Sequence, residues 1–554
     1  MINSHRVVLL FASLVLIMGR GNTDINSQTK LLLTGDTNRD GKVDFASDPE
    51  GRNTWSDQRG AVFMFNNDSD QNNGKQDCSD KVVNGPNDLL DLAPALIRQV
   101  PQLKDGGTLS ISVSEAARPY VHIFYKDGSD YVFVENNDGQ EIPLRLLKNG
   151  DVELRLEANS YACPSWDGKA EVTAVLGSPG DTQSDSVQLK VAPFIMLSAV
   201  QPALRIYVRD YPGKNERFIQ SLKEITAQIG VELKIIGPGT YPPWEIWLQD
   251  VMEIGYSKTP LRGNPVVLKA NRGSPLDDMP EKEMLGPDHG WFQCGEFRPE
   301  MGGGRRGDGW LDWYGNLEVT PPLPGQPFGR IFYGYDKSTG NSLNPQIVRM
   351  LEAQGVQAPL IKINTGWLLI KHVDEIFNFV PALGKAGKGF KLLVPDAALT
   401  YRLLDGWNAE GKGNLPILKE VTANETIASF EKKQELRDFN FRLQREEIEQ
   451  SIGEMKSAIG IDESDIIRIP ALFEKYENYA PALMPNMVNA AFMNGHLLMA
   501  DPRGPIENQK DLVQEYVRGL LSKEGVEVHF VDDLAYHNRG GNVHCATNVT
   551  RAFY

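Results

Sequence analysis

The stretch that decides the fold of the larger part of the chain is RIYVRDYPGKNERFIQSLKEITAQIGVELKII, residues 205–236. Its two ends, 205–210 and 231–236, are short runs rich in the β-branched and aromatic residues of strands. Between them apolar side chains recur every three or four residues from Phe218 to Ile229, which is the spacing of one helix face. A strand, a helix and a second strand in this order predict an α/β unit.

Upstream of this unit the pattern is of β type only. The runs are LSISVS at 109–114, YVHIFY at 120–125, YVFVE at 131–135 and EVTAVL at 171–176, and turns with Gly, Asp or Asn separate them. Short alternating runs between such turns predict an antiparallel β-sandwich. Because the pattern changes near Pro193, we expect a domain boundary there.

Two further helices are expected downstream. An amphipathic pattern covers 424–459, where Asn424 and Thr426 are the candidate caps. A second pattern covers 509–522 and stops before Gly525.

Composition restricts the classes of function. A chain of 554 residues is long enough for several domains, and 41% apolar with 23% charged residues is typical of a folded globular protein. The formal net charge of -16 argues against nonspecific binding to nucleic acid or anionic lipid, and it suits a cationic substrate and divalent cations. The four cysteines form no C-x-x-C pair, so neither a disulfide scaffold nor a zinc ribbon is indicated.

The N-terminal segment has the layout of a secretory signal peptide over residues 1–21. The apolar run VVLLFASLVLIM at 7–18 follows Arg6 and precedes Gly19 and Gly21. At twelve residues it is shorter than the roughly 20 needed to span a bilayer. We therefore expect a secreted or periplasmic protein whose mature chain has no stable membrane insertion. The alternative for this segment is a buried N-terminal strand or an uncleaved anchor. The alternative location of the protein is cytoplasmic.

A calcium-binding loop is suggested by DTNRDGKVD, which begins at Asp36 and offers further oxygen ligands from Asn38, Asp40 and Asp44. Position twelve is Ser47, where an EF-hand has a bidentate Glu, so a true EF-hand is not expected. The alternative is a solvated acidic turn. Further ligands are expected from the next polar loops, at Asn66, Asp68, Asp70, Asp77 and Asp80.

Three segments carry candidate catalytic chemistry: WLQDVMEIGY at 247–256, KHVDE at 371–375 and NRGGNVHCATN at 538–548. The last places Cys545 after a glycine-rich turn, where it is either a nucleophile or a small buried residue. The neighbouring His544 is not expected to pair with it, because adjacent side chains on an extended segment point to opposite faces.

A partner histidine for Cys545 must therefore come from elsewhere, and His372 is the candidate. On a strand, His372 and Asp374 would lie on the same face. The alternative is a structural His–Asp pair.

Together the three segments resemble the protein-arginine deiminase (peptidylarginine deiminase) family. Coverage runs from about residue 34 to the C-terminus, and the resemblance implies a shorter member without the additional N-terminal β-domain of the vertebrate enzymes. It implies a multi-domain chain with a calcium-binding immunoglobulin-like β-sandwich at 30–193 and a pentein-type α/β propeller catalytic domain at 194–554. The further similar stretches are MLGPD at 284–288, GNLEV at 315–319, PNMVN at 485–489 and the loops of the Asp36–Asp80 region.

The resemblance implies calcium-dependent hydrolysis of protein or peptidyl arginine to citrulline and ammonia. A guanidinium is planar and permanently cationic, so Asp250 and Asp374 would each bind it through paired hydrogen bonds. Cys545 would attack its central carbon to form a covalent thiouronium, and His372 would protonate the departing ammonia and then activate water.

Trp247 would line the slot for the arginine stem or stack on the cation. By the same resemblance, Arg272 and Arg539 would hold the backbone or wall of a peptidyl substrate. Surface charge is the alternative role for the two arginines. The implied ligands of a Ca²⁺ ion are the side chains of Gln249, Glu253 and Glu318 and the carbonyls of Tyr314 and Leu317.

Two positions depart from the family pattern. Val251 and Lys269 stand where the family commonly has acidic residues, which puts a second calcium site of the catalytic domain in doubt. Two other functions stay open: a deiminase or amidinotransferase acting on a small free guanidine, and a non-enzymatic secreted calcium-binding protein. The attached β-sandwich and Arg272 favour protein or peptide substrates.

Overall fold

The computed structural model describes residues 30–100, 107–135, 138–178, 180–298, 308–383 and 388–553. The expected signal peptide at 1–21 lies outside the described residues. Across the described ranges we find no helix with the length and apolar character needed to traverse a bilayer.

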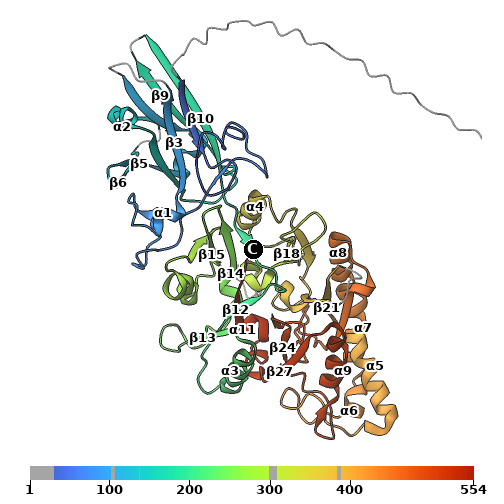
Figure 1. The fold of residues 1–554 in the computed structure, drawn as a ribbon. Helices are drawn as coiled ribbons and strands as arrows, with labels where there is room; N and C mark the ends of the chain where they lie inside the picture. Colours follow the sequence, from blue (N-terminus) through green and yellow to red (C-terminus); the bar gives the residue numbers. More distant parts are fainter. Residues whose placement is uncertain are drawn as a thin grey trace, which may run out of the picture.

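Two five-stranded sheets form the N-terminal part of the molecule, at one end of the view in Figure 1. Apolar side chains of both sheets, such as Leu154 and Val172, belong to one buried core, so the sheets pack face to face. The strands expected near 109, 120, 131 and 171 are confirmed. One pair departs from the expected antiparallel arrangement, because β2 and β10 run parallel. The first sheet has the order β1 (Lys30–Gly35), β3 (Ala93–Val100), β8 (Val152–Ala158), β5 (Val121–Asp127), β6 (Asp130–Phe133), and the second β2 (Ala61–Phe63), β10 (Asp181–Val191), β9 (Lys169–Ser178), β4 (Thr108–Val113), β7 (Asp138–Ile142).

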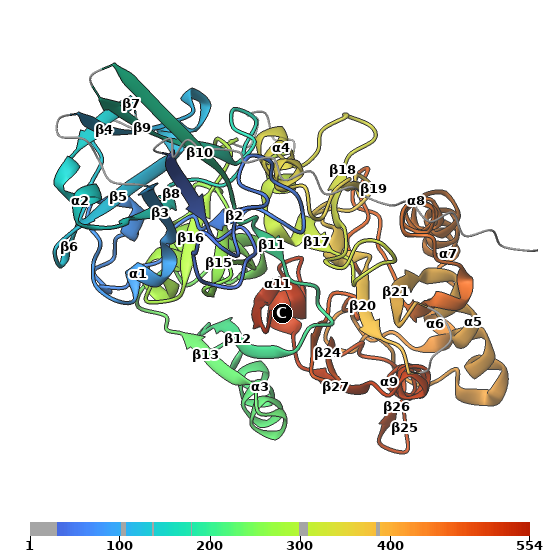
Figure 2. The same ribbon diagram turned by 45° about the horizontal axis from the view of Figure 1, so that its top comes forward.

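In the rest of the described chain, the strands form five small sheets and one two-stranded ribbon. In each of the five, one strand pairs antiparallel with one neighbour and parallel with another. In Figure 2 they lie around the C-terminal segment that contains α11 (Val543–Ala546). Their orders are β11 (Ile195–Met196), β14 (Met252–Lys258), β15 (Gly263–Lys269), β16 (Gly290–Gln293); β13 (Glu232–Ile236), β12 (Ala203–Arg209), β28 (Thr547–Arg551); β17 (Leu317–Val319), β18 (Ile331–Tyr335), β19 (Ile361–Asn364); β20 (Asn378–Pro381), β21 (Phe390–Asp396), β22 (Ile466–Pro470); and β23 (Ala491–Met493), β24 (His496–Ala500), β27 (Glu527–Val531).

The predicted α/β unit is confirmed: α3 (Glu216–Ile229) connects β12 to β13, and it buries Phe218 and Leu222. Further helices are α1 (Asp88–Asp91), α2 (Leu144–Asn149), α4 (Pro345–Gln354), α5 (Ala397–Trp407) and α10 (Leu534–His537), and the ribbon consists of β25 (Ile506–Glu507) and β26 (Lys510–Asp511).

The single helix expected over 424–459 is wrong in its continuity. The chain forms α6 (Ile427–Glu431), α7 (Gln434–Leu443) and α8 (Glu449–Ile459), with a π-helical turn between the last two. The helix is interrupted between α6 and α7 at Lys433, because the backbone ψ of 70° at this residue is not helical. Thr426 caps α6.

The helix expected at 509–522 is α9 (Leu512–Leu521). It begins later because Asp511 caps it, accepting hydrogen bonds from two backbone N–H groups of its first turn.

Candidate active site

Three titratable side chains from two distant segments of the sequence meet around Gly315. Asp250 lies in a short 3-10 turn before β14, and Asp374 lies in another whose N-cap is His372. A Cβ atom at position 315 would stand 2.5 Å from His372 Nδ1, 3.1 Å from Asp250 Oδ1 and 3.2 Å from Asp374 Oδ2. The three polar atoms therefore surround one small space, which a glycine leaves open.

The imidazole of His372 is fully buried and held from two sides. Its Nε2 lies 2.8 Å from the carbonyl oxygen of Trp310, and its Nδ1 lies 3.5 Å from Asp250 Oδ1. The expectation that His372 and Asp374 share the face of a strand is wrong, because a 3-10 turn follows His372 and its ring meets Asp250 instead.

Asp374 faces the C-terminal segment. Its Oδ2 lies 2.9 Å from His544 Nδ1 and accepts from Cys545 Sγ at 3.6 Å. Both C-terminal residues lie on α11, so the extended segment assumed from the sequence is wrong. His544 nevertheless turns to the carboxylate rather than to the thiol, so the sequence's exclusion of a His544–Cys545 pair agrees with these contacts.

Asn489 positions the cysteine, and sequence reasoning did not single it out. Its Nδ2 donates to Cys545 Sγ at 3.2 Å and its Oδ1 accepts from the Cys545 backbone N–H at 3.1 Å. The sequence signal was its place in PNMVN, one of the family-like stretches. The sequence gave no indication that the backbone carbonyl of Trp310 would contact His372.

A cavity of about 600 Å³ opens onto Cys545. Trp310, Glu375 and Asn489 contribute to its lining, together with Arg539. Asp250, His372 and Asp374 lie outside that lining, and all three are buried. The thiol is thus the group through which a solute in the cavity would first meet this cluster.

Burial and mutual repulsion oppose negative charge in the cluster. Burial raises the pKa of Asp250 to about 6, with Asp374 adding to the effect and His372 and Arg272 opposing it. Burial also raises the pKa of the Cys545 thiol well above its usual range, and the Asp374 and Asp250 carboxylates raise it further. A cation placed here would lower both pKa values, because it stabilises the charged forms.

Unpartnered polar atoms mark where a cation would fit. Asp250 Oδ1, His372 Nδ1 and Asp374 Oδ1 are buried and have no hydrogen-bond partner among the described residues. Two of these atoms, Asp250 Oδ1 and His372 Nδ1, border the space at Gly315, whereas Asp374 borders it through its Oδ2. Buried polar groups are normally paired, so the unpartnered atoms indicate a binding place for a polar group.

The three predicted substrate-binding residues have different surroundings. Trp247 packs against Gly541, where a Cβ would meet its ring at 2.5 Å. Arg539 lines the cavity and donates to the Tyr211 hydroxyl and the Trp244 carbonyl.

Arg272, which was predicted to hold a peptidyl substrate, is not part of the lining of the cavity at Cys545. Its guanidinium is buried between Glu245 at 2.9 Å and Asp277 at 2.8 Å, over the ring of Trp313. These ion pairs outweigh the effect of burial and raise its pKa. In this structure Arg272 acts on the site through its charge, which opposes the rise in the Asp250 pKa.

A second cavity, of about 40 Å³, lies behind His544 and is lined by the predicted calcium ligands Gln249, Glu253 and Glu318. Burial raises the pKa of Glu253 well above its usual range and that of Glu318 to about 7. Arg551 lines the same cavity and opposes both shifts.

The two carbonyl ligands have separate positions. The Tyr314 carbonyl accepts a hydrogen bond from Gln249 Nε2 at 3.3 Å, and Leu317 begins β17 just before Glu318. Neither residue is part of the lining of the small cavity.

Acidic side chains also gather where the β-sandwich meets β15. Asp68, Asp70 and Asp288 place carboxylate oxygens within 4.8 Å of one another, as do Asp70, Asp88 and Asp91. Burial raises the pKa of Asp68 to about 7 and that of Asp91 to about 9, although Arg262 opposes both shifts.

The other predicted ligands of this region surround the cluster. Asn66 donates to Asp88 and Glu157, both at 2.8 Å, and Asp77 accepts from the Asp70 N–H at 2.8 Å. Asp80 accepts from Asn84 at 3.1 Å. Sequence reasoning missed Asp88, Asp91 and Asp288 as candidate ligands; the last stands in the family-like MLGPD stretch.

The loop at Asp36 uses its oxygens differently. Asp36 accepts from the N–H groups of Asp40 and Gly41, Asn38 donates to Asp40, and Asp44 accepts from the turn that follows it. None of the metal-ligand groupings found among the described residues includes its three carboxylates.

Sequence comparisons with known proteins agree on one family. A sequence model of the family described as "Protein-arginine deiminase (PAD)" matches residues 181–554. Protein-arginine deiminase type-4 of Rattus norvegicus is 32% identical over 94% of this chain and 81% of its own length. Protein-arginine deiminase type-1 of Homo sapiens is 31% identical over 93% and 80%. Among solved structures, agmatine deiminase of C. jejuni aligns at 13% identity with a TM-score of 0.38 over 65% of this chain and 96% of its own.

The chain belongs to the protein-arginine deiminase family. It is therefore a hydrolase that acts on the C–N bonds of a guanidino group.

Proposed function

We propose that this protein hydrolyses arginine residues in proteins or peptides to citrulline and ammonia, through a covalent intermediate on Cys545 and with calcium as its activator. The observation that carries the proposal is the Cys545 thiol at a cavity, in front of two buried aspartates with unpartnered oxygens.

Binding of the substrate cation follows from charge and shape. Asp250 and Asp374 would receive the N–H groups of the guanidinium in paired hydrogen bonds, which are about twice as strong as neutral ones. The bound cation would offset the repulsion between the two carboxylates. It would also stabilise the Cys545 thiolate, whose formation the carboxylates alone oppose.

In the first half-reaction, a C–S bond would form between Cys545 Sγ and the guanidinium carbon. The C–N bond to one terminal nitrogen would break as His372 gives that nitrogen a proton, so ammonia leaves and a thiouronium remains. In the second half, water that has given a proton to His372 would attack the same carbon. The C–S bond breaks, the sulfur leaves as thiolate, and the added hydroxyl loses its proton to solvent, where the released ammonia takes it up as ammonium. The side chain becomes a neutral ureido group.

Calcium fits the small cavity behind His544. Gln249, Glu253 and Glu318 offer the oxygen ligands that this ion prefers, and Glu318 Oε1 is buried without a hydrogen-bond partner in the described part of the chain. Carbonyls of Tyr314 and Leu317 would complete the set. Because Gln249 precedes Asp250 directly, an ion held there would fix the position of the substrate-binding carboxylate, which is its contribution to the reaction.

The acidic cluster of the N-terminal part is proposed as a further calcium region. Its carboxylates come both from the β-sandwich, at Asp68, Asp70, Asp88 and Asp91, and from Asp288 after β15. Divalent cations would neutralise carboxylates whose burial otherwise holds them partly protonated.

The domain assignment is part of the same proposal. Residues 30–193 would form the immunoglobulin-like domain and 194–554 the pentein-type α/β propeller. The five small sheets with the same pairing pattern support five blades, and the two packed five-stranded sheets support the sandwich.

The experiment is incubation of the protein with a blocked arginine ester in millimolar calcium, with ammonia and citrulline measured. We expect equal molar amounts of both products, and none from Cys545→Ser, whose hydroxyl cannot replace a thiolate at neutral pH. Ammonia released equally by the Cys545→Ser variant would refute the covalent route.

A further inference from the structure

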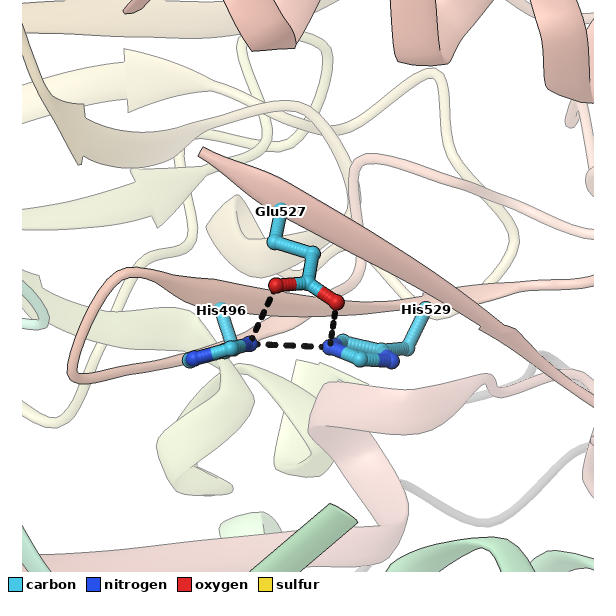
Figure 3. A group of neighbouring side chains, drawn as sticks. All are labelled: His496, Glu527 and His529. Carbon is cyan, nitrogen blue, oxygen red and sulfur yellow. Dashed lines mark hydrogen bonds and ion pairs between the residues drawn. The ribbon is translucent and has the colours of Figure 1, made fainter. Parts of the chain in front are cut away.

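A second group of potential ligands lies away from the deiminase site, on the sheet β23–β24–β27. Figure 3 shows His496 from β24 and Glu527 and His529 from β27, with their polar atoms turned to one common point. His496 Nδ1 lies 2.9 Å from His529 Nε2, and the Glu527 oxygens lie 3.5 Å and 3.6 Å from these two nitrogens.

The strand register produces this arrangement. β24 and β27 run parallel with His496 opposite Glu527, and His529 follows two residues later on the same face as Glu527. The backbone therefore places three side chains with metal-binding atoms at one end of the sheet. The two histidine side chains are 19% and 17% exposed and Glu527 is 59% exposed, so a solute can reach the cluster from solvent.

The spacing matches the edge of a tetrahedral metal site. Ligand atoms about 2.0–2.1 Å from a tetrahedral Zn²⁺ lie about 3.3–3.4 Å from one another. The two imidazole nitrogens are 2.9 Å apart, and each lies 3.5–3.6 Å from a different oxygen of the Glu527 carboxylate. One ligand atom from each of the three residues lies within 4.8 Å of the others, so small side-chain rotations would bring them into ligand range. Two imidazoles and one carboxylate suit zinc and its neighbours, whereas calcium prefers oxygen ligands alone.

We propose that His496, Glu527 and His529 form a binding site for a divalent transition metal of the zinc class, separate from the deiminase site. Three protein ligands leave a fourth position for water. A metal there would link β24 to β27 and stabilise the sheet, since an ion that binds only the folded chain raises its stability by mass action. The proposal is independent of the proposed deimination.

The competing account is a hydrogen-bonded cluster without metal. One N–H between the two rings satisfies the 2.9 Å contact, and a protonated ring would pair with Glu527. Such a cluster predicts no selective zinc binding.

The test measures zinc bound per chain by equilibrium dialysis and elemental analysis, in saturating calcium to fill oxygen sites. The parent protein carries Cys545→Ser, which removes the thiol of the active site as a zinc ligand. We expect the parent to bind one zinc more than His496→Gln/His529→Gln does. Co²⁺ in place of zinc should give the visible absorption of a tetrahedral site in the parent only.

Single variants guard against misfolding of the double variant. Glu527→Gln changes a mostly exposed side chain, and it should weaken zinc binding about tenfold or more, since even outer partners of metal ligands contribute that much. The matched control Glu515→Gln, on α9, should bind zinc as the parent does. Zinc binding that is absent from the parent, or equal in the parent and Glu527→Gln, would overturn the proposal.

Discussion

Asp374 has a double role at the level of single residues. One of its oxygens meets both His544 and Cys545, and the other is unpartnered within the described chain. The same charge that would hold a guanidinium also keeps the thiol protonated. In the proposed mechanism, substrate binding and activation of the nucleophile would therefore be coupled through one carboxylate.

This coupling predicts two opposite effects of Asp374→Asn. We expect kcat/KM to fall by about ten- to a hundredfold or more, because a charged hydrogen bond contributes about 1.5–3 kcal/mol. The pH at which iodoacetamide alkylates Cys545 should become lower, because a negative neighbour of the thiol has been removed. An unchanged alkylation profile together with unchanged kinetics would remove Asp374 from the site.

Gly315 is expected to be essential for activity, because a side chain at this position would fill the space between His372 and the two aspartates. In Gly315→Ala, the added methyl would lie 2.5 Å from His372 Nδ1, between it and the two aspartates. We expect turnover to be lost while far-UV circular dichroism stays native. Gly453→Ala is the control, since its Cβ meets nothing within 4 Å, and it should keep full activity. Full activity of Gly315→Ala would show that the space between the acids is not used.

The sequence named candidate site residues that the structure brings together, but it did not predict which of them contact one another. Cys545, Asp250, His372 and Asp374 could be named because resemblance preserves residue types in order. The partner of His372 could not, because the choice between a strand and a 3-10 turn at Val373 depends on tertiary contacts.

Among the elements, the segment from α10 to α11 is anchored by a buried acid. Asn542 Nδ2 donates to Asp533 Oδ2, and burial raises the pKa of Asp533 to about 7. In the unfolded chain this pKa is about 3.9. The folded state therefore binds the proton more tightly, and this contribution is complete below about pH 4 and lost as the pH rises through 7.

Asp533→Asn should remove this pH dependence, because an amide imitates the neutral acid. We expect the variant to gain stability relative to the wild type as the pH rises from 4 to 8. Urea unfolding at a series of pH values measures the difference. A difference that stays constant across this range would contradict the raised pKa.

The 3-10 turn Gln249–Val251 leads directly into β14, so Asp250 and Glu253 lie on one continuous segment. Glu253→Ala should raise the calcium concentration for half-maximal activity more than Asp40→Ala does, because Glu253 faces the cavity next to Asp250 and Asp40 lies in a distant loop. Calcium titrations of the ammonia-release rate compare the two. Equal shifts would assign activation to another site.

The boundaries of the helices over 424–459 could not be predicted from the local sequence. The pattern over 424–459 is helical throughout, yet Lys433 and the π-helical turn at 444–448 divide it. Thr426 was recognisable as a cap because a hydroxyl before a helix satisfies free N–H groups. α6 and α7 both contact α5, and the π-helical turn contacts β21, and local periodicity does not encode such tertiary contacts.

At the scale of the whole molecule, one buried core runs from the sandwich into the α/β part. Leu154 and Val266 belong to the same cluster, and Gln354 of α4 donates to the Ala162 carbonyl. Sequence patterns predicted the β-only and α/β parts, but not how the sheets assemble. The last strand, β28, pairs with β12 near the start of the α/β part, a contact without any local signal.

The most direct test of the account is the ammonia-release rate with a blocked arginine ester and with free arginine, each in millimolar calcium and in excess chelator. Arg539 on the cavity wall offers donors suited to backbone carbonyls, so the blocked substrate should give the higher kcat/KM. Chelator should abolish that activity. Preference for free arginine, or full activity in chelator, would contradict calcium-dependent deimination of peptidyl arginine.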